Sequence, residues 1–131
     1  VRTIDGLQVR ASEYYKDKLT LVICWASWCS PCTRDACDII PIYNEYRNRG
    51  LNMFSLAHEF KSTDAMRKSV ERHAFPWLCL VDLDDEFGVF RKHGTQNSAL
   101  FLIDCDGTII AVPNSVEELK AKLEEIFPDN K

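Results

Sequence analysis

Two cysteines separated by two residues are the side chains in this sequence best placed to do chemistry. They lie in Trp28-Cys29-Ser30-Pro31-Cys32, after an apolar stretch and before a segment with helical spacing. Thiol-disulfide exchange needs a thiolate nucleophile and a second thiol that resolves the mixed disulfide. The start of a helix favours the anion, because its unpaired N–H groups and dipole are positive there. The spacing therefore predicts a redox dithiol in which Cys29 attacks and Cys32, one turn further in, resolves.

Two other uses of a Cys-x-x-Cys pair remain open. A closed zinc site takes four ligands, but no second pair of Cys or His stands at a matching spacing in the sequence. A purely structural disulfide between Cys29 and Cys32 would close a very small loop and would therefore stabilise the fold little. The redox interpretation is preferred, and it requires neither a metal nor an organic cofactor.

The other four cysteines are not assigned to this chemistry. Cys24 and Cys79 lie within apolar stretches, where a free cysteine behaves as a small buried hydrophobe. Cys37 is five residues beyond Cys32, so on a helix it points away from that residue's face. Cys105 lies near a predicted turn, where a reactive exposed thiol is an open alternative.

The elements that position the motif alternate between strands and helices. Strands are expected at 19–25, 51–57 and 78–81, helices at 31–49 and 63–74, a hairpin of strands at 100–103 and 108–112, and a closing helix after Ser115. The β-α-β-α order predicts parallel strands joined by right-handed crossovers, and Asp106-Gly107 is a strong hairpin turn signal. The expected fold is a three-layer α/β domain whose mixed sheet ends in an antiparallel hairpin.

Length and charge narrow the classes of protein further. The 131 residues suit one domain, residues 1–131, and the net charge of −4 argues against a nucleic-acid partner. No apolar run approaches the roughly 20 residues that cross a bilayer. The first residues contain neither an initiator Met nor an apolar leader, so we expect a trimmed or mature chain whose signal or anchor, if any, lies outside it.

The stretch from Val22 to Cys32 resembles the thioredoxin superfamily. Trp-Ala-Ser-Trp-Cys-x-Pro-Cys is most similar to the TlpA/ResA-type branch, which comprises extracytoplasmic thiol-disulfide oxidoreductases. Further matches are residues 6–15, which resemble the N-terminal extension of that branch, the segment 75–77 and the hairpin at 101–107. The resemblance implies a thioredoxin-like fold over the whole chain, with residues 1–18 as its N-terminal extension.

The same resemblance implies roles for residues around the dithiol. Trp28 corresponds to the aromatic residue that lines the docking surface, and Ser30-Pro31 to the dipeptide that tunes the redox potential. Asp35 lies where ResA-type proteins carry an acidic residue implicated in proton handling. A carboxyl there could accept a proton if burial raised its pKa. The plain alternative is a solvated aspartate on the helix surface.

The sequence departs from the family pattern at three positions. Ser98 stands where the family has a cis-proline opposite the dithiol, and a trans Asn97–Ser98 bond is expected because a non-proline cis bond costs roughly 2.5 to 4 kcal/mol. Substrate docking is therefore expected to differ. Ile23 replaces the buried aspartate of thioredoxins, and Cys37 replaces a helix proline.

The expected function is reduction or exchange of disulfides in extracytoplasmic, for example periplasmic, proteins. The expected partners are protein disulfides or dithiols and an upstream electron donor, and we expect a monomer. One alternative is a thioredoxin-like binding or accessory module with little turnover, suggested by Ser98. A further alternative is peroxide reduction at Cys29, which the resemblance disfavours because such peroxidases place an Arg-supported single Cys in a different motif.

Overall fold

A six-stranded sheet forms the centre of the computed structural model, which describes residues 1–92 and 99–127. Its strands are β1 (Arg2–Thr3), β2 (Thr20–Trp25), β3 (Asn52–Glu59), β4 (Leu78–Leu83), β5 (Ala99–Ile103) and β6 (Ile109–Ala111). The helices are α1 (Ser12–Tyr15), α2 (Ser30–Tyr46), α3 (Asp64–His73), α4 (Val89–Lys92) and α5 (Val116–Ile126), with a short 3₁₀ helix η1 (Arg47–Arg49) after α2.

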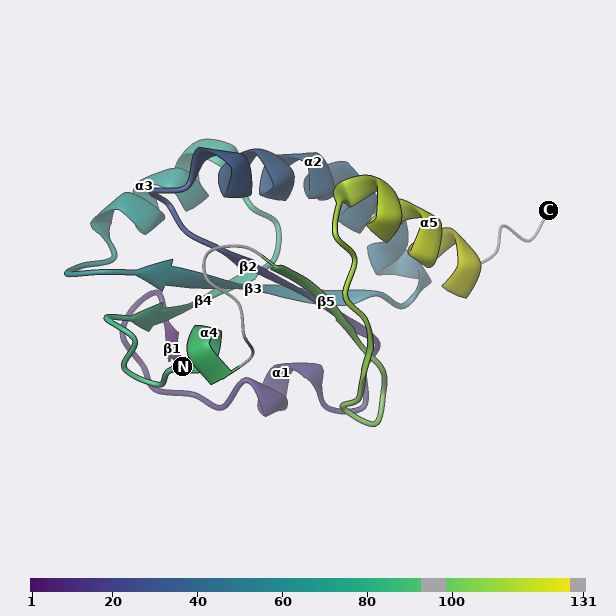
Figure 1. Ribbon diagram of the computed structural model, residues 1–131, viewed down its shortest axis with the longest axis horizontal. Coiled ribbons are helices and arrows are strands. Elements are labelled where there is room, and N and C mark those ends of the chain that lie inside the picture. The colour runs from purple at the N-terminus through teal and green to yellow at the C-terminus, as the bar shows by residue number, and fades with distance from the viewer. Residues whose placement is uncertain (93–98, 128–131) are drawn as a thin grey trace.

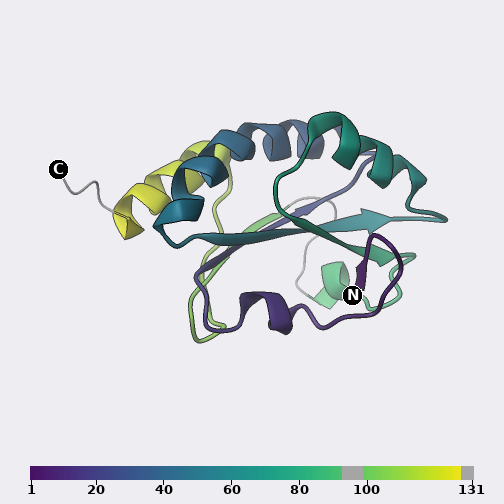
Figure 2. The same cartoon turned by 180° about the vertical axis from the view of Figure 1, so that it is seen from behind.

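The helices lie on both faces of the sheet. Helices α2, α3 and α5 cover one face, and the short helices α1 and α4 lie on the other, as both views show (Figures 1 and 2). Separate clusters of buried apolar side chains fill the space on each side, the larger one under α2, α3 and α5. The predicted three-layer α/β arrangement is confirmed.

The strand that leads to the dithiol is the most deeply buried strand of the sheet. All six residues of β2 are buried, as the continuous apolar run at 19–25 predicts for a central strand. Strand order is β1-β4-β3-β2-β5-β6, with β2, β3 and β4 parallel to one another and β5 antiparallel to β2. The carboxyl ends of β2 and β3 therefore meet at one edge of the sheet, where the chain enters α2.

Two strands continue beyond their predicted ends. Strand β3 runs to Glu59 instead of 57, and β4 runs to Leu83 instead of 81. The acidic turn that begins at Asp82 suggested that β4 ends at 81, but the Asp82 side chain is buried and hydrogen-bonded. Asp82 is fully buried, and its carboxylate accepts hydrogen bonds from the backbone N–H groups of Phe87 (2.9 Å) and Val89 (3.1 Å). Hydrogen bonds from the turn that follows β4 thus replace the solvent that the Asp82 carboxylate would otherwise need.

The helix ends follow the local sequence signals. Helix α2 passes into η1, and the chain turns at Gly50 with φ of 112°, a conformation that glycine adopts without a Cβ clash. Helix α5 is capped by Ser115, whose Oγ accepts the N–H of Glu118 at 3.1 Å, as the spacing of these two residues predicts. None of the helices in the described ranges has the length and apolar character needed to span a membrane.

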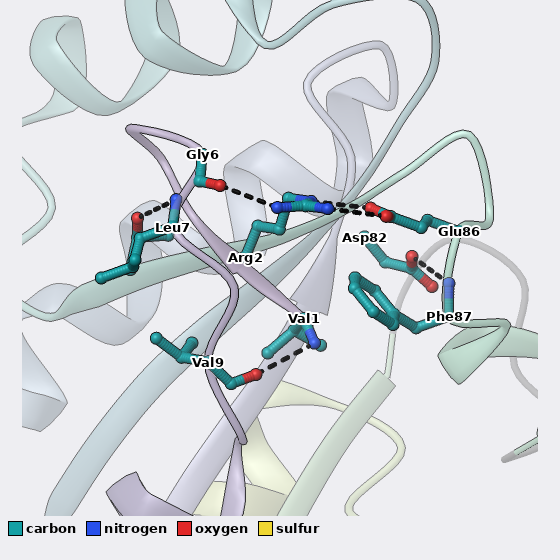
Figure 3. Close-up of polar contacts among 9 residues, drawn as sticks. Val1, Arg2, Gly6, Leu7, Val9, Asp82, Glu86 and Phe87 are labelled. Carbon is teal, nitrogen blue, oxygen red and sulfur yellow. Dashed lines mark hydrogen bonds and ion pairs between the residues drawn. The ribbon is translucent and has the colours of Figure 1, made fainter.

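The N-terminal segment adds an edge strand that the sequence did not reveal. Strand β1 pairs antiparallel with β4, and the guanidinium of Arg2 donates to both carboxylate oxygens of Glu86 at 2.8 Å (Figure 3). Arg2 also donates to the carbonyl of Gly6 at 2.9 Å. These contacts attach the N-terminal segment to the turn that follows β4.

Candidate active site

The dithiol lies where strand β2 ends and helix α2 begins. Cys29 is the N-cap of α2 with an extended backbone, and Ser30 and Pro31 form the first helical turn. Proline fits this turn because the N–H that it lacks would have had no partner within the helix. Cys32 follows in that turn, so the local sequence alone is enough to place both sulfur atoms at the start of the helix.

Cys29 and Cys32 form a disulfide. Their Cα atoms are 5.3 Å apart, within the range of roughly 4.4 to 6.8 Å found for disulfides, so the folded backbone already holds the two residues at bonding distance. Cys29 is partly exposed, whereas Cys32 is only 2% exposed. An incoming protein can therefore contact the Cys29 sulfur more readily than that of Cys32. This is the order of exposure that the motif predicts.

An exposed aromatic surface adjoins the dithiol. Trp28, the residue before Cys29, is 51% exposed, and its indole Nε1 donates to the backbone carbonyl of His58 at 2.9 Å. The ring of Phe60, itself 47% exposed, lies 6.2 Å from the Trp28 ring, centroid to centroid. Large apolar rings exposed together on a protein surface suggest a contact site for another molecule.

The carboxyl end of β3 supports this surface. The His58 ring is stacked on Phe90 with centroids 4.2 Å apart, and its Nε2 lies 2.7 Å from the Asp85 carboxylate. Asp85 belongs to the turn after β4, so a hydrogen bond and ring packing fix His58 between two elements. The carbonyl that receives the Trp28 indole is thus held by neighbouring parts of the fold.

The remaining predicted site residues occupy different surroundings. Ser30 and Pro31 are exposed in the first turn of α2. Asp35 lies one turn after Cys32 with an exposed side chain, and partial burial, helped by the negative charge of Asp38, raises the pKa of its carboxyl. A raised pKa is the direction that proton acceptance requires. Ser98 lies outside the described residues.

The sequence model of the AhpC/TSA family matches residues 1–112 of the chain. The chain belongs to the AhpC/TSA family. It is 25% identical over 127 residues to the thiol-disulfide oxidoreductase ResA of Bacillus thuringiensis subsp. konkukian, covering 95% of this chain and 70% of that relative. The predicted resemblance to ResA-type proteins is confirmed.

Solved structures of similar fold include proteins described as disulfide oxidoreductases. The thioredoxin domain of a thiol-disulfide oxidoreductase from Bacteroides vulgatus superposes with a TM-score of 0.82 at 21% identity, covering 95% of this chain and 89% of that one. A secreted Mycobacterium tuberculosis disulfide oxidoreductase, homologous to DsbE of E. coli, gives 0.73 at 19% identity, covering 95% and 92%. This member of the AhpC/TSA family thus has the thioredoxin-like fold, and with its ResA relatives it is a thiol-disulfide oxidoreductase.

The other cysteines of this AhpC/TSA family member occupy the surroundings expected for them. Cys24 and Cys79 are 4% and 8% exposed, and burial raises the pKa of the Cys24 thiol to about 12. Cys37 is partly buried on α2, and Cys105 is exposed beside the hairpin turn. Burial suppresses the thiolate, so Cys24 is unsuited to nucleophilic chemistry.

One residue near the dithiol went unnoticed in the sequence. Glu59 is 2% exposed, its Oε2 accepts the backbone N–H of Ser27 at 2.7 Å, and its Oε1 accepts the Ser27 hydroxyl. Glu59 continues the alternation of Met53, Ser55 and Ala57 along one face of β3. A charged residue at that phase, at the carboxyl end of a strand beside the dithiol loop, is the signal that could have identified it.

Across residues 1–92 and 99–127, no three His, Cys, Asp or Glu side chains gather in a way that could hold a metal ion. The Cys29–Cys32 pair of this AhpC/TSA family member is instead joined sulfur to sulfur.

Proposed function

We propose that this protein reduces or exchanges disulfides in other proteins through its Cys-Ser-Pro-Cys dithiol. The observation that carries the proposal is the disulfide at the start of α2, in which Cys29 is partly exposed and Cys32 is covered. The order of exposure supports Cys29 as the attacking thiol and Cys32 as the resolving one. The aromatic pair of Trp28 and Phe60 supports docking of a polypeptide beside Cys29.

The reaction proceeds in two exchange steps. In the reduced protein the Cys29 thiolate attacks one sulfur of a substrate disulfide, a mixed disulfide forms, and one substrate thiolate leaves. The Cys32 thiol then loses its proton and attacks the Cys29 sulfur, which releases the second substrate thiolate and forms the Cys29–Cys32 disulfide. Two electrons pass to the substrate, and the dithiol of an upstream donor protein returns them.

Helix α2 and Asp35 supply the electrostatics of these steps. The N-terminal N–H groups of α2 stabilise the thiolate on Cys29. The raised pKa of the Asp35 carboxyl, caused by partial burial and by Asp38, suits it to take up the proton that Cys32 releases. Trp28 provides apolar contact, and Ser30 and Pro31 set the potential. At position 98 the sequence has a serine where the family has its proline.

The proposed setting is outside the cytoplasm, in the periplasm or an equivalent compartment. Support comes from the relatives, since one solved structure of the same fold is a secreted disulfide oxidoreductase. Protein disulfides are common substrates in oxidising compartments of this kind. The protein is proposed to act as a monomer that meets its donor and its substrates in turn.

Reduction of insulin disulfides by a chemical donor tests this function. We compare wild type with Cys29→Ser, Cys32→Ser and Ser98→Pro. Turnover should depend on both cysteines, and Ser98→Pro should raise the rate if the residue at 98 limits docking. Wild-type turnover no higher than that of Cys29→Ser would refute the proposal and would favour a binding module with the same fold.

A further inference from the structure

The two side-chain oxygens of Glu59 are both directed to one residue of the loop before the dithiol. A carboxyl group that is 2% exposed must have hydrogen-bond partners, because a buried polar group without them is costly. Here Oε2 accepts the Ser27 N–H at 2.7 Å and Oε1 accepts the Ser27 hydroxyl. Ser27 precedes Cys29 by two residues, so the contact joins strand β3 to the loop that carries the attacking cysteine.

A second hydrogen bond joins the same loop to strand β3. Trp28 donates its indole N–H to the carbonyl of His58, so consecutive loop residues are held by consecutive residues of β3. Strand β3 is itself anchored at this end, since the Glu59 carbonyl accepts the N–H of Asp84 at 2.8 Å. We call the hydrogen bonds from Ser27 to Glu59 and from Trp28 to His58 the loop clamp.

The loop clamp determines how the chain enters α2. The N–H of Cys29 donates to the Ala26 carbonyl at 3.1 Å, closing a turn whose two middle residues are Ser27 and Trp28. The Cys29 carbonyl then accepts the N–H of Thr33 at 3.1 Å, the first bond of the helix. The favourable effect of a helix terminus on an anion falls off within one turn, so a small displacement of Cys29 would weaken it.

We propose that Glu59 is a positioning residue for the dithiol, holding Ser27 so that the Cys29 sulfur sits at the N-terminus of α2. The proposal rests on the proposed function of Cys29 as the attacking thiol. Two effects of Glu59 oppose each other and can be separated. Its hydrogen bonds promote the Cys29 thiolate by placing it, whereas a negative charge at position 59 would repel that thiolate.

Substitutions at position 59 distinguish placement from charge. In Glu59→Gln the amide oxygen can accept the Ser27 N–H and the amide NH₂ can donate to the Ser27 hydroxyl, so the contacts remain while the charge is removed. Glu59→Ala removes both the contacts and the charge. Ser27→Ala removes the hydroxyl contact and keeps the backbone one. Glu71→Ala, at an exposed glutamate of α3, is the control for loss of a surface carboxylate.

The measurement is the rate at which iodoacetamide alkylates Cys29 in the reduced protein, resolved by peptide mass spectrometry from pH 5 to 10. Circular dichroism confirms that each variant is folded. Near neutral pH, Glu59→Ala should be alkylated about two- to fivefold more slowly than wild type, the range that a helix terminus contributes to an anion. Glu59→Gln keeps the contacts and loses the repelling charge, so it should be alkylated at least as fast as wild type. Glu71→Ala should match wild type, and Ser27→Ala should be slowed less than Glu59→Ala.

Any result in which the Gln and Ala variants of Glu59 move together overturns the proposal. Faster alkylation in both would show that charge alone acts, and no change in either would show a purely structural role. If Glu59→Ala does not fold, Ser27→Ala provides the test. An unchanged rate of Cys29 alkylation across the pH range in Ser27→Ala refutes the proposal that Glu59 positions Cys29 through Ser27. Alkylation requires no turnover, so failure of insulin reduction would refute the proposed function without deciding the role of Glu59.

Discussion

Reduction of the Cys29–Cys32 disulfide should lower the free energy of unfolding only slightly. The bond closes a loop of four residues, since the cysteines are three positions apart. In the chain-entropy description such a loop stabilises the oxidised protein by about 2 kcal/mol. Against this, the start of α2 stabilises the Cys29 thiolate of the reduced protein by about 0.3 to 1 kcal/mol. The oxidised form should therefore be more stable by about 1 to 1.5 kcal/mol above a pH of about 8.5, where the thiolate is fully formed.

The same difference in stability between the oxidised and the reduced protein shifts the redox potential of the dithiol. A difference of about 1.4 kcal/mol corresponds to about 30 mV for a two-electron couple. The folded dithiol should therefore be about 20 to 35 mV more reducing than the same sequence in the unfolded chain. The stabilisation of the thiolate is present above the unfolded pKa of a cysteine, about 8.5, and is lost as the pH falls below the lower value in the folded protein. The stability gap should accordingly narrow as the pH rises toward 8.5.

Urea unfolding of the oxidised and reduced protein at pH 6, 7 and 8 measures the gap. The double variant Cys29→Ser/Cys32→Ser serves as the control, because it retains the other four cysteines and should unfold identically with and without reductant. A reduced form that is as stable as the oxidised form, or more stable, would refute the reasoning. It would mean that the start of α2 stabilises the Cys29 thiolate by at least as much as loop closure stabilises the disulfide. A protein with a stabilised reduced form is an oxidant.

Three further outcomes follow from individual contacts. In the native reduced protein Cys105 should be alkylated readily, whereas Cys24, 4% exposed and with its thiol pKa raised by burial to about 12, should react only after unfolding; peptide mass spectrometry at several urea concentrations checks this. Trp28→Ala should lower kcat/KM for insulin reduction about fivefold, since half of the indole, worth about 1 kcal/mol on burial, remains exposed for a partner to cover; an unchanged value would remove Trp28 from the docking surface. The hydrogen-bonded ion pair with Arg2 lowers the pKa of the Glu86 carboxyl. The stability that this pair contributes is therefore present above the ordinary glutamate pKa of about 4.3 and is lost as the pH falls below it. In urea unfolding, Glu86→Gln should be less stable than wild type at pH 7 but equal to it in strong acid.

The elements that the sequence predicted best are those defined by neighbours along the chain. The buried strand β2 shows as an unbroken apolar run, and the helix after it begins at the cysteines as their spacing requires. Helix α5 shows in the spacing of Ser115 and Glu118, whose contact the structure contains. In each case a few adjacent residues carry the whole signal, so a local pattern is sufficient.

The features that were missed depend on partners far away in the chain. Strand β1 has two residues and forms only because β4 lies beside it, and no pattern in so short a segment specifies that pairing. Glu59 lies beyond the strand expected at 51–57, and it is buried because Ser27, 32 positions earlier, provides both donors. Such contacts follow from the topology of the sheet, which brings the carboxyl ends of β2 and β3 together.

The polar groups proposed to act on the dithiol come from elements other than its own strand. Six residues before Cys29, where thioredoxins carry a buried aspartate, this chain has Ile23, which is 2% exposed and part of the apolar core. Strand β2 therefore brings no titratable group to the site. Helix α2 contributes its N-terminus and Asp35, and strand β3 contributes Glu59 through Ser27. A chain with this arrangement can alter its redox chemistry by substitutions in α2 or β3 while β2 keeps the apolar packing on which the fold depends.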